Sequence, residues 1–154
     1  MSEVSIQPGV MHQTPLIMGL LAGAVTSVLA AQPASPPKEL TGKLWLLQKL
    51  DQDTADPTIR STVSFAPDGK ANGATGCNRW FGAAQFDGST VRFSQVGTTR
   101  MACPKPQMDR ETAFTRMLGL TRSWTLGGGD LSLSGEDGSV LAVFRPEPTP
   151  AVKK

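Results

Sequence analysis

The chain has 154 residues, enough for one domain with additional segments. Hydrophobic residues make up 39% of it and charged residues 18%, so a buried core is feasible. Its 16 glycines and 12 prolines favour many tight turns, and therefore β-structure over helix. The net charge is +2, and the longest basic run is the terminal Lys153-Lys154, which is too small to indicate nucleic-acid binding. Tyrosine is absent and there are only three tryptophans, so an aromatic platform for stacking bases has little support as well.

The N-terminal part of the chain predicts export. An apolar run from Leu16 to Ala30 is too short for a membrane span, which needs about 20 residues, but it is typical of a secretory signal. The small residues that end this run predict cleavage after Ala30, so residues 1–30 are interpreted as a signal peptide and 31–39 as a proline-rich linker. The positive charge that usually begins a signal is missing. An uncleaved anchor or a buried helix is the alternative.

Short segments with apolar residues at every second position predict strands separated by tight turns. Pro67-Asp68-Gly69 is typical of a hairpin turn, and residues 51–58 are expected to form a polar loop. The expected strands are 40–50, 62–66, 70–76, 79–86, 90–96, 123–126, 130–134 and 139–145.

The period changes after the fifth of these strands, between Pro106 and Leu120. Apolar residues recur there at helical spacing, which predicts one helix. Asp109 and Glu111 are interpreted as favourable charges near its N-terminal end. The elements together predict a mostly β domain, an antiparallel meander that curls into a small or partial barrel with one inserted helix. A flat sheet covered by the helix is the alternative.

The two cysteines, Cys77 and Cys103, are expected to form a disulfide, because two cysteines in an oxidising compartment usually pair. The loop between them would stabilise the fold by roughly 3–4 kcal/mol in the chain-entropy model. A redox-active pair is one alternative, because Cys103 lies near a helix start and Arg100, conditions that lower the pKa of a thiol. Two unpaired buried thiols are the other.

Two motifs carry a resemblance to a known family. They are Gly76-Cys77-Asn78-Arg79-Trp80-Phe81-Gly82 and Thr99-Arg100-Met101-Ala102-Cys103, and Trp45 and Pro67-Asp68-Gly69 precede them. In this order they resemble the META domain family, which includes HslJ-like heat-shock proteins, over residues 40–146. The tail, 147–154, is expected to be disordered. The resemblance implies a lipocalin-like, mostly β fold in a periplasmic or secreted protein with a stress-associated role and no settled biochemical activity.

Four motif residues besides the cysteines are interpreted as structural. Asn78 is expected to satisfy backbone groups across a bend. Gly76 and Gly82 are expected to serve backbone geometry, Gly82 at a bulge or a close approach of two strands. Met101 is expected to fill the core beside the disulfide, and Met108 to pack the helix onto the sheet.

No catalytic, cofactor or metal site is predicted. Met101, Cys103 and Met108 are soft ligands that suit copper, but packing explains them as well. The single histidine, His12, lies in the segment expected to be removed. The sequence also lacks a Gly-x-Ser-x-Gly motif and a phosphate-binding loop.

Two functional hypotheses follow. The first is a non-enzymatic, exported domain of the bacterial cell envelope that acts by binding, with an unidentified envelope protein as partner. The second is a small carrier of an apolar ligand. Contact with nucleic acid is not expected, and contact with a membrane is expected only through an uncleaved N-terminal segment. The protein is expected to be a monomer. The large residues predicted to point inward favour a filled interior; they are Trp45, Phe65, Phe86, Phe93, Trp124 and Phe144.

Overall fold

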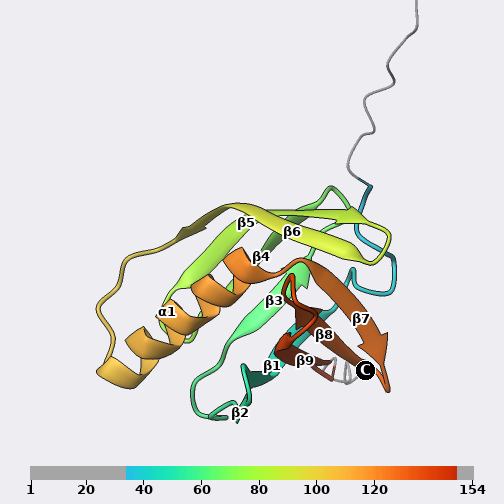
Figure 1. The fold of residues 1–154 in the computed structure, drawn as a ribbon. Helices are drawn as coiled ribbons and strands as arrows, with labels where there is room; N and C mark the ends of the chain where they lie inside the picture. Colours follow the sequence, from blue (N-terminus) through green and yellow to red (C-terminus); the bar gives the residue numbers. More distant parts are fainter. Residues whose placement is uncertain (1–33, 149–154) are drawn as a thin grey trace, which may run out of the picture. The chain divides into compact units, whose positions relative to one another are not determined.

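The computed structural model describes residues 34–148, and the predicted signal peptide lies outside this part of the chain (Figure 1). Within it, the predicted strands and the predicted helix all occur, with small shifts at their ends. None of its helices is long and apolar enough to cross a membrane. The elements are β1 (Leu44–Leu50), β2 (Asp53–Thr54), β3 (Thr62–Phe65), β4 (Lys70–Ala74), β5 (Arg79–Asp87), β6 (Thr90–Thr98), α1 (Lys105–Leu120), β7 (Ser123–Gly127), β8 (Asp130–Ser134) and β9 (Val140–Pro146).

The strands form one antiparallel meander whose two ends meet. From β3 to β9, each strand pairs with the next one along the chain. β1 pairs with β3 on one side, through Trp45 and Val63, and with β9 on the other, through Leu47 and Phe144. Hydrogen bonding therefore runs around a ring. The prediction of a mostly β, barrel-like meander with one inserted helix is confirmed, and the flat-sheet alternative is wrong.

β2 lies where the sequence predicted only a polar loop. It pairs with the end of β1 through Leu50 and Asp53 and through Lys49 and Thr54. Asp51 makes the intervening turn with a φ of 55°. Both residues of this strand are polar and exposed, so no hydrophobic alternation marked it in the sequence.

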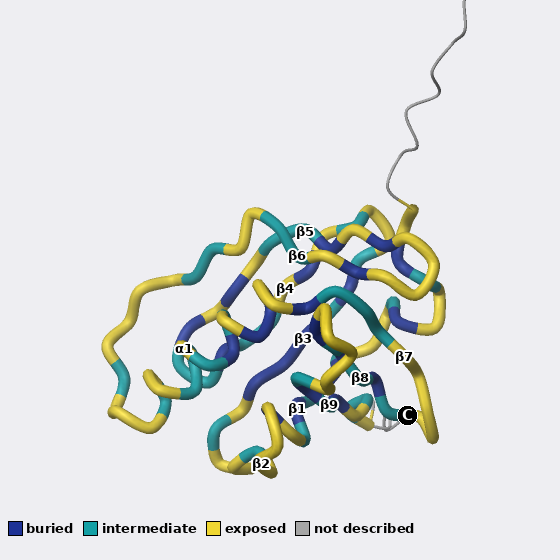
Figure 2. Tube along the Cα trace, viewed as in Figure 1, coloured by how far each residue is buried: buried dark blue, intermediate teal, exposed yellow. Residues whose placement is uncertain are grey.

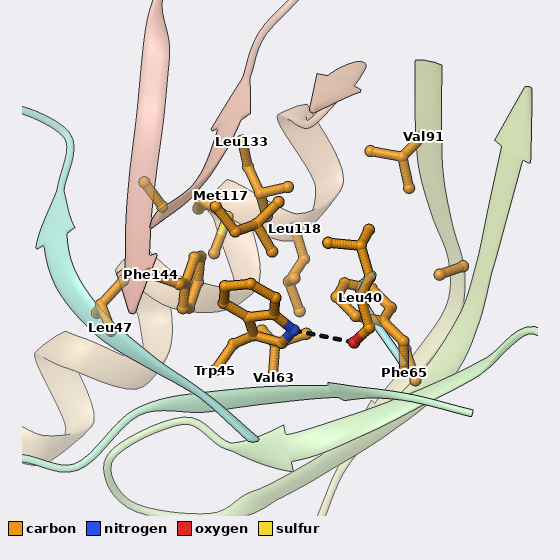
Figure 3. Close-up of a cluster of buried hydrophobic side chains, with 14 of the residues drawn as sticks. Leu40, Trp45, Leu47, Val63, Phe65, Val91, Met117, Leu118, Leu133 and Phe144 are labelled. Atoms are coloured by element: carbon orange, nitrogen blue, oxygen red, sulfur yellow. Dashed lines mark hydrogen bonds between the residues drawn. The ribbon is translucent and has the colours of Figure 1, made fainter. Parts of the chain in front are cut away.

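The helix α1 is inserted between β6 and β7, which share one register pair, Thr90 with Ser123. Its apolar stripe, formed by Phe114, Met117 and Leu118, is buried as predicted. Figure 3 shows two of these side chains in the same cluster as residues from the strands. The helix therefore adds its apolar residues to the core that the ring of strands encloses.

Aromatic side chains fill this interior. Four of the six residues predicted to point inward are buried, Trp45, Phe65, Phe86 and Phe144, and the other two, Phe93 and Trp124, are partly buried against them. Figure 2 shows buried positions along the strands, interspersed with intermediate and exposed ones, and long exposed stretches in the turns. Neighbouring ring centroids lie 5.5 to 6.3 Å apart in a continuous chain of Trp124, Phe86, Phe65, Phe93, Trp80, Phe114 and Phe144.

The segment before β1 packs against the domain. Ala34 donates its N–H to the carbonyl of Phe86 at 3.2 Å, and Pro36 is buried. Leu40 is also buried, and its carbonyl accepts a hydrogen bond from Nε1 of Trp45 at 3.0 Å (Figure 3). From Ala34 onward, the expected proline-rich linker is therefore part of the folded unit.

Candidate functional site

The two cysteine motifs meet beside the start of α1. Cys77 lies in the bend between β4 and β5, Cys103 lies in the connection between β6 and α1, and a disulfide joins them. Gly76 has a φ of 111°, a conformation that strains any residue with a side chain. A methyl group at this position would also lie 2.6 Å from Cγ2 of Ile59. Glycine is therefore required next to Cys77.

Asn78 holds the connection to α1 through its side-chain amide. The residue is 3% exposed. Its Oδ1 accepts the N–H of Met101 at 2.7 Å and the hydroxyl of Thr99 at 3.0 Å. Its Nδ2 donates to the carbonyl of Met101 at 3.3 Å. The amide thus binds both backbone groups of Met101, as a neighbouring strand would, and keeps this connection in register with the bend.

Glu111 of α1 binds the same bend from the helix side. Its Oε2 accepts the hydroxyl of Thr75 at 2.6 Å and the backbone N–H of Asn78 at 3.1 Å. Its Oε1 accepts a hydrogen bond from Nδ2 of Asn78 at 3.2 Å. The interpretation of Glu111 as a charge at the helix start is wrong, because the first turn contains no acidic residue and this carboxylate faces the bend.

A pattern in the sequence marks the position of Glu111. It lies three residues before Phe114 and seven before Leu118, so all three share one face of the helix. An acidic residue on the buried stripe of a helix needs a hydrogen-bonding partner inside the protein. That spacing could have identified Glu111 as part of the site.

Thr75 completes the cluster, and the sequence interpretation did not single it out. It is fully buried, and its hydroxyl accepts the backbone N–H of Asn78 at 2.9 Å while donating to Glu111. Its own N–H donates to the carbonyl of Asn78 at 2.8 Å. A threonine at the end of a strand is common, so its sequence position carried no separate signal. We refer to Thr75, Asn78 and Glu111 as the bend network.

Gly82 lies farther along β5, at an irregularity in its pairing with β6. The register shifts between Phe81 and Ala83. A methyl group on Gly82 would lie 2.9 Å from the carbonyl oxygen of Ser94. Glycine at this position therefore permits the two strands to approach closely at the bulge.

The two methionines near the disulfide do not pack as predicted. Met101 was expected to fill the core, but its side chain is 59% exposed, so that prediction is wrong. The structure uses the backbone of Met101, which Asn78 binds, and leaves its thioether in solvent. Met108 is 38% exposed, and its Sδ lies 3.6 Å from Sγ of Cys77. It therefore covers the disulfide and is not buried between helix and sheet.

The site joins three segments of the chain. Both carboxylate oxygens of Glu111, both polar side-chain atoms of Asn78 and the hydroxyl of Thr75 have partners inside the domain. The sulfur atoms of the two cysteines are bonded to each other. Within residues 34–148, no group of three His, Cys, Asp or Glu side chains is placed to hold a metal ion. The arrangement therefore holds the backbone of the bend, of the connection from β6 and of α1 in fixed relative positions.

Two hollows near the site open to the surface. One, of about 340 Å³, lies between α1 and the turn from β1 to β2, where Arg110 and three aspartates line it. The second, also of about 340 Å³, is lined in part by Asp56. Hydrogen bonds from Thr58, together with the charge of Arg110, lower the pKa of Asp56. Neither lining includes a member of the aromatic chain that fills the interior.

Comparisons with known proteins agree with this architecture. A sequence model of the META domain family matches residues 38–148. A protein from Burkholderia xenovorans with an NMR structure is 19% identical, with a TM-score of 0.57 over 95% of this chain and 100% of that chain. Another NMR structure is 19% identical, with a TM-score of 0.57 over 71% of this chain and 93% of that chain. At this identity, the likeness to both structures concerns the fold alone. No curated protein matches the chain.

Proposed function

Because the chain belongs to the META domain family, we propose that it is an exported, non-enzymatic domain of the bacterial cell envelope that acts in stress tolerance by binding another envelope protein. The apolar run from Leu16 to Ala30 supports export. The disulfide between Cys77 and Cys103 suits an oxidising compartment, either the periplasm or the cell exterior.

One observation carries the proposal. The polar groups of the bend network bind one another and the backbone, and they have no free atoms directed at a substrate. A general acid or base must come within hydrogen-bonding distance of the group with which it exchanges a proton. Glu111 already accepts hydrogen bonds at both oxygens from the domain itself. The surface is then the part of the domain that is available for function, and this favours binding.

The carrier hypothesis has less support. A ring of about eight strands holds a ligand when its interior leaves space. Here the aromatic chain from Trp124 to Phe144 occupies that interior, with ring centroids at most 6.3 Å apart. The two hollows lie at the surface, one of them beside α1, and both are partly lined by charged residues, which suits an apolar ligand poorly.

Export is tested on the protein from its natural host. We expect fractionation to place it in the envelope and N-terminal sequencing to find a mature chain that begins near Ala31. An intact N-terminus at Met1 or Met11, recovered from the cytoplasm, would contradict export.

Binding is tested by crosslinking in intact cells under heat stress. We expect an adduct with another envelope protein, together with reduced heat survival in a strain that lacks the chain. Phe114→Asp introduces a charge into the core and should abolish both adduct and survival. Glu136→Gln changes an exposed turn and should preserve both. Recovery of one apolar molecule per chain, with no protein adduct, would support the carrier instead.

A further inference from the structure

The exposed residues of the two cysteine motifs belong to neighbouring stretches of backbone at the surface of the domain. At the start of β5, Asn78 and Trp80 are buried, whereas Arg79 and Phe81 are exposed, as strand alternation requires. Thr99 donates its N–H to the carbonyl of Arg79 at 3.0 Å, so the two residues that follow Thr99 also lie near β5. We refer to Arg79, Phe81, Arg100 and Met101 as the Phe81 surface.

This surface exposes two large apolar side chains. Phe81 is 55% exposed and Met101 is 59% exposed. A methyl group on Gly97 would lie 2.8 Å from the ring of Phe81, so the ring lies against the backbone of β6 at this glycine. The ring therefore packs over this glycine, while much of the residue stays open to solvent. Figure 2 shows that most of the connection from β6 to α1 is exposed as well.

The charges of the surface are positive and lack partners. Arg79 and Arg100 are exposed, and no carboxylate of residues 34–148 forms a salt bridge with either of them. Guanidinium groups bind carboxylates through paired hydrogen bonds, and an adjacent apolar surface strengthens such recognition.

We propose that the Phe81 surface binds an acidic segment of a partner protein, with an apolar side chain of that segment on the Phe81 ring and its carboxylates on Arg79 and Arg100. This inference rests on the proposed binding function and locates it. A membrane surface fits less well, because aromatic residues that bind bilayers enter the boundary between headgroups and acyl chains. The ring of Phe81 lies against Gly97 instead.

The test places the photo-crosslinking residue p-benzoylphenylalanine at Phe81 of the full chain in its host, with Val140 as the control position. Val140 is 41% exposed in β9. We expect position 81 to form an adduct with a protein, and mass spectrometry to map the link to a peptide rich in Asp and Glu. Arg79→Glu with Arg100→Glu should lower the adduct yield at least about tenfold, because the change replaces attraction by repulsion.

A matched variant, Lys49→Glu with Arg116→Glu, makes the same change in charge at two exposed residues elsewhere. It should leave the adduct unchanged, and thermal unfolding should show that both variants remain folded. An adduct that charge reversal does not weaken, a linked peptide without acidic residues, or a link to lipid would overturn the inference. Adducts at position 140 alone would overturn it while leaving the binding function intact. No protein adduct at either position would count against both.

Discussion

Replacing Glu111 with glutamine keeps the size of the side chain and changes one of its two acceptors into a donor. In the wild type, Oε2 accepts hydrogen bonds from Thr75 and from the backbone of Asn78, and Oε1 accepts one from the side chain of Asn78. In either orientation of the glutamine amide, its NH2 group faces at least one of these donors. The less costly orientation points NH2 at Nδ2 of Asn78, and one hydrogen bond is then lost.

The size of the effect follows from these contacts. A buried donor without an acceptor costs about 1–3 kcal/mol, and loss of the negative charge weakens the remaining hydrogen bonds. Because Glu111 is only partly buried, water compensates for part of the loss. We therefore expect the free energy of unfolding to fall by roughly 2 kcal/mol, which lowers Tm by about 8 °C in a domain of this size.

Thermal unfolding at neutral pH measures this effect. Glu136→Gln, in the exposed turn before β9, removes the same charge and should change stability by less than about 0.5 kcal/mol. Combining Glu111→Gln with Thr75→Val in a double-mutant cycle should give a coupling energy of about 1 kcal/mol. The reasoning would be refuted if Glu111→Gln lowered Tm no more than Glu136→Gln does.

Three further predictions concern the rest of the domain. Replacing Cys77 and Cys103 together with serine should lower the free energy of unfolding by about 3–4 kcal/mol, measured with denaturant, and an unchanged midpoint would contradict a stabilising disulfide. Phe144→Ala should lower the free energy of unfolding by about 3–5 kcal/mol, because Phe144 is fully buried, and Phe93→Ala should lower it less, because Phe93 is only partly buried. Equal, small losses in the two variants would indicate a loosely packed interior. Hydrogen bonding to Arg145 lowers the pKa of Asp130, and hydrogen bonding to Arg60 lowers that of Glu147. A lowered folded-state pKa stabilises the protein above the ordinary carboxyl pKa of about 4, and this stabilisation is lost as the pH falls through the folded-state value. Tm measured from pH 7 to pH 2 should therefore fall at the acidic end, and it should fall less in Asp130→Asn. If that variant lost Tm with acid to the same extent as the wild type does, the stabilising role of the Asp130 carboxylate would be contradicted.

The strands and the helix could be predicted because the hydrophobic pattern of each one lies within a short stretch of sequence. Val63 and Phe65 alternate with polar residues, and both are buried in β3. Phe114 and Leu118 recur at helical spacing, and both are buried in α1. Closure of the ring, in which Leu47 pairs with Phe144, joins residues far apart in the chain. No local periodicity encodes such a contact, so the sequence could suggest closure but could not fix which strands meet.

The site was harder to predict because its residues act through the backbone. Met101 was interpreted from its side chain, yet Asn78 binds its N–H and carbonyl and the thioether is exposed. Glu111 was interpreted from its distance to the helix start, which is a local property. Its actual partners, Thr75 and Asn78, lie in a bend more than 30 residues earlier. Only the helical face shared with Phe114 and Leu118 indicated that Glu111 points inward.

The disulfide and the bend network both hold the start of α1, and they act in different ways. In the chain-entropy model, the disulfide restricts the unfolded chain and fixes one point of contact between the bend and the helix connection. One point leaves the orientation of the segments open. The bend network adds hydrogen bonds from Asn78 to the Met101 backbone and from the bend to Glu111 on the helix, so it sets that orientation. The outward-facing residues on the same segments then have fixed relative positions. A partner that binds the Phe81 surface meets an ordered backbone, which reduces the entropy lost on association.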